Sequence, residues 1–596
     1  MRKAIWSTFL LHLAPLVLSA ADPGYNCRPG QKCWPTESEW RQFNTSLDGN
    51  LFETTPIAAS CYPNSPHYDK AACEEVQDYY GNSTARGTHF GQTYWLNWET
   101  CHNSGCALLE TDPLQRLYET CSIGSLASFY VKVQNPTHIS TALKFAKTHN
   151  IRISVKNTGH DYYGRSSLPN TLSIWTHDLD TMDFHANFKA HKCPSSNGQN
   201  VGELGAGVIA GDAYRYFHTQ GMDITGGYEQ SVGIAGGFAQ GGGVGSFTTT
   251  YGLMVDNAVE FEVVTADGEV RIINACNDPE LFWAMRGGGG GTYAILTKYR
   301  VQVYPSVPIH TYTFIANFTG VGYYENATEN VALREIMTAH AQSQLNWSAQ
   351  LVTGQVEYFP EKFAVGLVLP YGDDGSKLRA ATGAFAVFLR NRTDLAVEQD
   401  NYTSYLSYAD FLSVTAARAK VTEPAGIFSL LATRLIPRNV FEEDKSIDDL
   451  VDGVLQGIAT SRSLLNLTGT QIVSETPLTN LDNDQLSSAH PAWRNAIWHV
   501  IHAGEWLEPL DKDEHLRTTT GFLDMLEPLK KLSPGGGAYL NEAHYLEPQW
   551  QQTYFGSFYD RLLKVKNDYD PTHIFDCYKC VGWRGDKDPF YSCYDW

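Results

Sequence analysis

A histidine lies inside a small, polar, turn-forming loop, at a place where core packing gives no reason for an imidazole. The loop follows a short apolar run and holds Gly159, His160 and Gly164. Two glycines permit a tight backbone whose successive N–H groups point at one spot, and such a nest binds an anion such as a pyrophosphate. A surface histidine without a chemical role is the alternative, and this loop by itself leaves both interpretations open.

Two further regions could approach the same bound group. Residues 226–245 are rich in glycine, and in residues 278–291 a run of five glycines follows Arg286. Glycine in such numbers carries a cost in conformational entropy, which close approach of the backbone to a cofactor would explain. The N–H groups of the glycine-rich region would stabilise negative charge on that cofactor. A tightly packed turn region without a ligand is the alternative.

Arg286 has two interpretations of equal weight. Its guanidinium could bind a phosphate group. It could equally be a cation at the end of a helix, where it meets the negative end of the helix dipole.

The elements around the first loop form a strand, a helix and a second strand. Residues 129–134 alternate in polarity as a strand does, and Asn135 and Pro136 are typical of the N-cap and first position of a helix. Helical spacing continues to about Asn150, and residues 151–155 form the next strand. Such a unit places a ligand-binding turn at a sheet edge. No Gly-x-Gly-x-x-Gly fingerprint follows this strand, which argues against NAD binding.

Hydrophobic patterns elsewhere predict the rest of the fold. Further strands are expected at 202–213, at 259–273 with a turn at 266–268, and at 292–304, with a helix capped by Asp278. Beyond Pro308 the strand-like runs are 309–317, 349–359, 363–370, 427–435 and 493–503, and the helical patterns are 325–345, 378–389 and 442–458. We interpret this second part as an antiparallel sheet backed by helices, whose free sheet face would cover the cofactor.

The three motifs, in this order and spacing, resemble the flavin-dependent oxidases of the vanillyl-alcohol oxidase superfamily, which have a PCMH-type FAD-binding domain. The resemblance is greatest to the berberine-bridge-like, secreted fungal branch that includes isoamyl alcohol oxidase-type proteins. It covers about residues 121–304 and resumes near the C-terminus, at Tyr539-Leu540-Asn541-Glu542 and beyond. It implies an α+β fold with two domains.

Pattern and resemblance together predict that the chain is divided into five segments. They are a signal peptide at 1–21, a disulfide-rich N-terminal segment at 22–120, the FAD-binding domain at 121–306, a substrate domain at 307–534, and a C-terminal segment at 535–596 that completes the FAD domain. The last segment holds Phe558, Leu562 and Val565 on one helical face.

The resemblance implies FAD joined covalently to His160. Many relatives add a second bond from a cysteine in a Cys-Pro-Thr-Val-Gly-like run, but the aligned run here is Glu229 to Gly233, and no cysteine lies between Cys193 and Cys276. We therefore expect monocovalent FAD. The cofactor contacts implied are Asn157, Thr158, Gly159, His160, Asp161, Gly164, Ser166, Gly227, Ser231, Val232, Gly233, Gly236, Gly237, Tyr539 and Asn541.

The catalytic base expected from the resemblance is Glu542. Relatives often carry tyrosine there, near the substrate, so the carboxyl is a departure that could change the chemistry. Beside an apolar ring its pKa could rise toward neutrality, whereas a salt-bridged surface glutamate is the alternative. A strand would point Asn541 and Glu542 to opposite faces, so this role needs the strand to end or bulge at Asn541. Weaker candidates are Tyr162, His502 and His544, and a core histidine is the commoner case for His502.

Composition and short motifs limit the binding partners and the cellular location that can be expected for this chain. The chain of 596 residues carries a net charge of −21 without a basic cluster, which argues against nucleic acid. Arg2, Lys3 and a short apolar run are typical of a cleaved signal peptide, and no later stretch is apolar enough for a bilayer. Sequons for N-glycans occur at Asn44, Asn82, Asn317, Asn326, Asn346, Asn391, Asn401 and Asn466. The twelve cysteines, including Cys577 and Cys580, are expected in disulfides rather than in a zinc site or any other metal site.

We therefore expect a secreted FAD-dependent oxidase that takes hydride from an alcohol-type or secondary-metabolite small molecule and passes electrons to O2, giving H2O2. In relatives the residue at the place of Val232 lines the path of oxygen to the flavin, and a small residue there permits oxidase behaviour. Two alternatives stay open. One is a dehydrogenase of the same fold that excludes oxygen, and the other is a secreted flavoprotein without turnover.

Overall fold

The structure of the protein is a computed structural model, and it describes residues 27–194, 198–319, 327–359, 361–372, 374–418, 425–474, 486–585 and 589–594. The expected signal peptide and the sequon at Asn326 lie outside the described residues. Among those described, no helix is both long and apolar enough to cross a membrane.

A mixed four-stranded sheet carries the His160 loop. Its strand order is β1 (Leu51–Glu53), β4 (Phe129–Lys132), β6 (Leu172–Trp175) and β5 (Ile153–Lys156), with the last three parallel. Helix α4 (Pro136–His149) joins β4 to β5, and Asn135 Oδ1 accepts from the N–H of His138 as its N-cap. Asn150 ends it in the left-handed conformation, so the predicted strand–helix–strand unit is confirmed. The loop follows directly after β5.

An antiparallel five-stranded sheet lies beside the first one. Its order is β11 (Val270–Asn274), β10 (Ala258–Thr265), β12 (Ala294–Gln302), β8 (Gln199–Gly205) and β7 (Met182–Phe188). The expected hairpin at 266–268 is confirmed by the β10–β11 pairing. The strand expected at 202–213 is wrong in its second half. There α5 (Ala210–Thr219) begins, because Ala210, Ala213 and Phe217 form a buried helical face.

Helix α7 (Pro279–Ala284) begins where the sequence predicts, but Asp278 does not cap it. Asp278 has a positive φ of 52° and makes no capping bond with its side chain. Its Oδ1 instead accepts from the hydroxyl of Tyr569 at 3.0 Å. Tyr569 ends α15 (Tyr559–Tyr569), which packs on α7 and on which Leu562 and Val565 are buried as expected. The C-terminal segment thus lies against the five-stranded sheet region.

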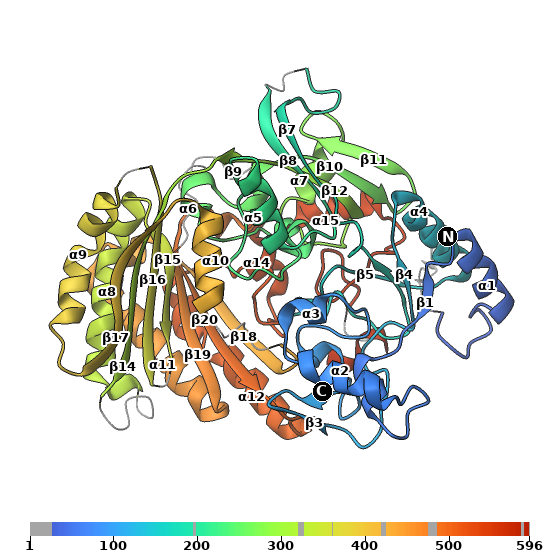
Figure 1. The fold of residues 1–596 in the computed structure, drawn as a ribbon, viewed down its shortest axis with the longest axis horizontal. Helices are drawn as coiled ribbons and strands as arrows, with labels where there is room; N and C mark the ends of the chain where they lie inside the picture. Colours follow the sequence, from blue (N-terminus) through green and yellow to red (C-terminus); the bar gives the residue numbers. More distant parts are fainter. Residues whose placement is uncertain are drawn as a thin grey trace, which may run out of the picture.

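A seven-stranded antiparallel sheet forms the second half of the molecule (Figure 1). Its order is β17 (Leu395–Tyr405), β14 (Ile309–Phe318), β16 (Lys362–Pro370), β15 (Thr353–Tyr358), β19 (Leu467–Ser474), β20 (Ala496–Trp506) and β18 (Phe428–Pro437). Helices α8 (Val331–Ala349), α9 (Ser376–Arg390) and α11 (Asp444–Leu464) contact its strands and lie on its outer side in Figure 1. The expected strands and helices are confirmed, while β17 and β19 were not predicted.

The remaining elements connect these sheets. They are α1 (Glu37–Ser46), α2 (Lys70–Tyr79), α3 (Ser83–Gly87), α6 (Thr248–Tyr251), α10 (Tyr408–Arg418), α12 (Lys512–Asp524), α13 (Glu527–Leu532) and α14 (Trp550–Phe555), with the short pairs β2 (Leu108–Leu109) with β3 (Asp112–Arg116) and β9 (Met222–Asp223) with β13 (Tyr304–Pro305).

All twelve cysteines are paired in disulfides, which confirms that expectation. The pairs are Cys27–Cys33, Cys61–Cys73, Cys101–Cys593, Cys106–Cys121, Cys193–Cys276 and Cys577–Cys580. The Cys101–Cys593 disulfide joins residues 492 positions apart. It holds the N-terminal segment and the end of the described chain together.

Candidate active site

A cavity of about 330 Å³ lies where loops of the first two sheets meet the seven-stranded sheet. Its lining includes Ile153 and Asp576 as well as Gln355 and Glu357 on β15. Most of the predicted site residues line it, namely Asn157, Thr158, Gly159, His160, Asp161, Tyr162, Gly164, Ser166, Gly227, Val232, Gly233, Gly236, Gly237, Tyr539, Asn541 and Glu542. Segments far apart in the sequence therefore converge on one space.

His160 is held on two sides. Its Nε2 lies 2.8 Å from Oγ of Ser231, which sits behind the imidazole rather than in the cavity lining. The ring of Tyr94 stacks on the imidazole with centroids 3.9 Å apart. Burial lowers the pKa of His160 to about 3, so the imidazole is neutral near pH 7. A neutral imidazole with a fixed ring has a lone pair available for bond formation.

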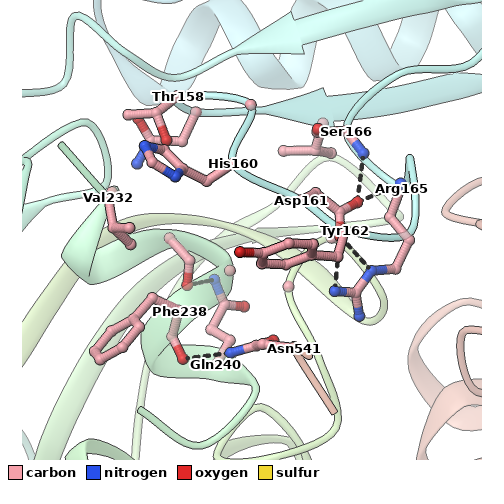
Figure 2. A pocket seen from close by; sticks show the side chains of 18 of the residues that line it. Thr158, His160, Asp161, Tyr162, Arg165, Ser166, Val232, Phe238, Gln240 and Asn541 are labelled. Atoms are coloured by element: carbon pink, nitrogen blue, oxygen red, sulfur yellow. Dashed lines mark hydrogen bonds and ion pairs between the residues drawn. The ribbon is translucent and has the colours of Figure 1, made fainter. Parts of the chain in front are cut away.

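Asp161 shapes the rest of the loop. Its Oδ1 accepts two hydrogen bonds from Arg165, one from Nε at 3.1 Å and one from Nη2 at 2.9 Å, as Figure 2 shows. The carboxylate also accepts from the backbone N–H groups of Tyr163 and Ser166, each at 3.2 Å. These bonds fold residues 161–166 into a tight turn beside the cavity. Because Arg165 already neutralises Asp161, neither charge needs a ligand.

The glycine-rich segment approaches the His160 loop closely. A Cβ on Gly233 would lie 2.1 Å from Nδ2 of Asn157, and one on Gly236 would lie 2.9 Å from the same atom. The Asn157 amide itself donates to the carbonyl of Ala206 at 2.6 Å. A Cβ on Gly237 would meet no protein atom within 4 Å, although this residue lines the cavity. Bare backbone at the wall of a cavity fits a flat, anionic cofactor such as FAD.

Residues 539–542 form a turn, not a strand. The N–H of Glu542 donates to the carbonyl of Tyr539 at 3.0 Å, which closes the turn. The amide of Asn541 donates to the carbonyl of Phe238 at 3.1 Å and to the hydroxyl of Tyr539 at 2.8 Å. The irregularity that Glu542 needs to face the cavity is therefore present. Asn541 and Glu542 both line the cavity, and Figure 2 shows the Asn541–Phe238 bond.

Glu542 is a partly buried carboxyl on the cavity wall, with a side chain that is 31% exposed. Burial raises its pKa to about 7. Nδ1 of His499 lies 3.8 Å from Oε2 of Glu542. Burial lowers the pKa of His499 to about 3, so this histidine is neutral and does not hold Glu542 ionised. A carboxyl with such a pKa can accept or release a proton near neutral pH.

The seven-stranded sheet adds polar groups that the sequence analysis did not identify. On β15 and β19, Glu357 lies directly opposite Gln471, whose amide donates to Oε1 of Glu357 at 3.0 Å. Gln355 lies two residues from Glu357 on the same face, and all three line the cavity. Burial raises the pKa of Glu357, and the bond from Gln471 opposes that shift.

His502 lies on the face of β20 that is turned away from the cavity. Its Nδ1 bonds with Oγ1 of Thr470 at 2.8 Å, and its Nε2 would be 2.4 Å from a Cβ on Gly457 of α11. It is fully buried between sheet and helix, so the structure does not bring it to the cavity. The pairing register instead puts His499 on the cavity side, in one row with Val473 and Gln355.

His544 and Arg286 also lie outside the cavity lining. His544 is buried, and its Nδ1 accepts from the N–H of Leu546 at 3.1 Å. The guanidinium of Arg286 lies 4.3 Å from the ring of Phe282 and donates to the carbonyl of Leu486. Arg286 thus anchors the segment at Leu486 just after the end of α7, and it lies outside the cavity in which a phosphate would bind.

Tyr94 is a site residue without a readable signal in the sequence. It belongs to the irregular N-terminal segment, and its N–H donates to the carbonyl of Gly159 at 3.0 Å. The next residue, Trp95, has its ring 5.0 Å from that of Tyr162. This segment therefore covers the His160 loop.

Two family models match the chain. One for an FAD binding domain matches residues 127–274, and one described as berberine and berberine like matches residues 538–580. The first contains the His160 loop and the glycine-rich segment, and the second contains the turn at 539–542. Both matches therefore fall on the walls of the cavity.

Several fungal proteins are similar over nearly the whole length. The VAO-type flavoprotein oxidase VAO615 of Thermothelomyces thermophilus is 31% identical, covering 92% of either chain. The FAD-linked oxidoreductase ZEB1 of Gibberella zeae is 29% identical, covering 96% of this chain and 95% of its own. The crystal structure of the VAO-type flavoprotein MtVAO615 from Myceliophthora thermophila superposes with a TM-score of 0.82 at 28% identity, over 94% of this chain and 97% of that one. Glucooligosaccharide oxidase of Acremonium strictum shares the fold, with a TM-score of 0.64 at 16% identity over 90% and 98% of the chains.

Proposed function

The chain belongs to the VAO-type FAD-linked oxidoreductases, and from that premise we propose that it is an oxidase for a small alcohol- or amine-type donor. When bound, the flavin accepts a hydride from the donor carbon and returns the electrons to O2, giving H2O2. The chain's own residues bind the cofactor, orient the donor and move its proton.

FAD is held, in this proposal, by a single covalent bond to His160. Its neutral imidazole lines the cavity, which supports a nucleophilic role. All twelve cysteines are in disulfides, so no thiol is free to make a second bond. Asn157, Asn541 and the glycine backbone would hold the rest of the cofactor.

Glu542 is the proposed base, and its position is the single observation that carries the proposal. It lines the cavity from the same turn as Asn541, and burial raises its pKa to about 7. A carboxylate in this state can take the proton from the donor's hydroxyl or amine as the hydride leaves the neighbouring carbon. His499, 3.8 Å away, orients the carboxyl without neutralising it.

The donor would lie between the flavin and the seven-stranded sheet. Gln355, Glu357 and Gln471 present amide and carboxyl groups there, and Tyr162 and Tyr228 present rings. Such a mixture of hydrogen-bonding groups and aromatic faces suits a small molecule with hydroxyl or amine groups. Val232, which also lines the cavity, is small enough to leave a path for oxygen.

We also propose that the protein is secreted and carries N-glycans. The exposed positions of Asn82, Asn391 and Asn466 support attachment of glycans at those sequons. The apolar N-terminal run supports secretion.

The test begins with purified protein and its flavin. We expect a yellow protein that keeps its flavin after acid precipitation, with the mass of one FAD on the peptide that contains His160. His160→Ala should release the flavin under the same treatment. A panel of alcohols and amines is then scored for H2O2 in air and for flavin bleaching without oxygen. Bleaching without H2O2 would identify a dehydrogenase, and a protein without flavin would refute the proposal.

A further inference from the structure

A chain of hydrogen bonds leads from His160 to a carboxylate. Oγ of Ser231 lies 2.8 Å from Nε2 of His160 and 2.6 Å from Oε1 of Glu229. The backbone N–H of Ser231 donates to the same carboxyl oxygen at 3.0 Å. Ser231 is 2% exposed, so water does not compete for its hydroxyl.

The direction of these bonds settles which nitrogen of His160 carries hydrogen. An ionised carboxylate only accepts, and a serine hydroxyl has one hydrogen to donate. Ser231 therefore donates to Glu229 and accepts from His160. Nε2 of His160 is then the N–H, and Nδ1 keeps the lone pair.

The imidazole ring is fixed in place as well as in protonation. Tyr94 stacks on one face at 3.9 Å, and the N–H of Tyr94 donates to the carbonyl of Gly159 next to His160. Ring rotation would break the Nε2 bond to Ser231. Geometry thus presents a single nitrogen of His160 as the nucleophile.

From this geometry we propose that Ser231 and Glu229 form a proton relay that prepares His160 for its covalent bond to FAD. The inference rests on the covalent attachment proposed above. By the resemblance described in the sequence analysis, Glu229 takes the place of the cysteine that makes a second bond in many relatives. The carboxylate of Glu229 cannot form the thioether bond that a cysteine would make to the flavin. In this proposal it instead accepts a proton when the bond at His160 forms.

The chemistry of the step balances with O2 as the oxidant. A bond forms between Nδ1 of His160 and the 8-methyl carbon of FAD, while one C–H bond of that methyl group breaks and its hydrogen leaves as a proton. Alkylated His160 would be a cation, so its Nε2 proton passes to Ser231 as the serine proton passes to Glu229. The two electrons released are held by the flavin and then reduce O2, which with two protons gives H2O2.

The experiment measures covalent attachment, not turnover. Protein made without flavin is mixed with saturating FAD in air, and the fraction of flavin that stays with the chain after acid precipitation is followed over time. Peptide mass confirms the bond at His160. We expect Ser231→Ala and Glu229→Gln to slow attachment by at least about tenfold, since a lost proton-transfer group costs this much or more. Saturating FAD prevents weaker binding from counting as slower bonding.

Two variants serve as controls. Ser231→Thr keeps the hydroxyl and should attach flavin at nearly the wild-type rate. Glu269→Gln makes the same carboxyl-to-amide change at an exposed position and should behave as the wild type. Near-ultraviolet circular dichroism identifies a variant that fails to fold. If Ser231→Ala fails to fold, the rate of attachment in Glu229→Gln, which alters only the carboxyl group, decides whether the relay exists.

The outcomes separate the relay from the function it rests on. Wild-type rates in both Ser231→Ala and Glu229→Gln, with covalent flavin in the wild type, would overturn the relay alone. Absence of covalent flavin from the wild type would overturn the attachment at His160 and the relay with it, while oxidase activity could still be measured with dissociable FAD.

Discussion

The flavin-binding loops and the seven-stranded sheet line one cavity by different means. The loops contribute mainly backbone, because Gly233, Gly236 and Gly237 bring N–H groups close to the space. The sheet contributes side chains, because Glu357 and Gln471 reach out from flat strands. Backbone binding suits a cofactor that does not change, whereas side chains on strands can be exchanged without altering the fold. Substrate choice should therefore reside in the sheet.

The largest effect is expected at the turn between these two regions. Glu542→Gln keeps the shape but removes the proton acceptor, and we expect flavin reduction to slow by about a hundredfold or more. In the wild type the rate should rise with pH as Glu542 ionises, with a midpoint at about 7. That midpoint should be absent from the variant. Anaerobic stopped-flow reduction across pH measures both, and an unchanged rate and profile would remove Glu542 from the mechanism.

A glycine of the loops gives the next largest effect, on cofactor affinity. A Cβ on Gly241 would lie 2.1 Å from Oδ1 of Asn541, whose Nδ2 already donates to the carbonyl of Phe238 and the hydroxyl of Tyr539. Gly241→Ala should displace Asn541 at a cost of about 1–3 kcal/mol, which corresponds to a loss of roughly fivefold to 150-fold in FAD affinity.

Titration of FAD into protein made without flavin measures this loss. In the control Gly372→Ala, a Cβ would meet no atom within 4 Å. Equal affinity in the two variants would mean that backbone packing in the loops is not what binds FAD.

A smaller effect is expected for a substitution in the seven-stranded sheet, and it should change KM for the donor instead of FAD affinity. Glu357→Gln replaces a carboxyl group with an amide on the donor side, which should raise KM about tenfold. The flavin spectrum and FAD affinity should stay the same. Glu398→Gln, an exposed change on β17, is the matched control. If Glu357→Gln weakened FAD binding instead, the division of labour between loops and sheet would be wrong.

The smallest effect concerns oxygen. Val232→Ile adds one methylene group to the cavity wall and should slow reoxidation of the reduced enzyme severalfold, without changing its reduction by the donor. Stopped-flow mixing with O2 tests this. Slow reoxidation of the wild type would itself point to a dehydrogenase.

The same contrast explains what could be predicted from sequence. Asn135 and Pro136 specify a helix start through local chemistry, and the polar loop around His160 stands out from its apolar surroundings. The loops on the cofactor side of the site could therefore be recognised in the sequence. The N-terminal cover of the site could not, because Tyr94 lies in a segment without periodicity.

For the seven-stranded sheet, the sequence could not show which face of each strand lines the cavity. Glu357 alternates with Val356 and Tyr358, a pattern that fits a solvent-facing residue as well as a cavity-facing one. On β20 the histidine considered in the sequence analysis, His502, faces α11, while His499 lies on the other face of the strand, beside Glu542. A strand pattern separates the two faces but does not say which face is covered by another domain.

The Cys101–Cys593 disulfide and its neighbours have a consequence for biosynthesis. The hydroxyl of Tyr594 donates to the carbonyl of Tyr163, in the loop that carries His160, and its ring packs on Trp98. The wall of the cavity thus depends on a residue 431 positions after the loop that carries His160. A nascent chain can fold its first sheet early, but it cannot complete this pocket until the residues around Tyr594 have been synthesised. We therefore expect cofactor loading to follow the folding of the first sheet by the time needed to synthesise the second half of the chain.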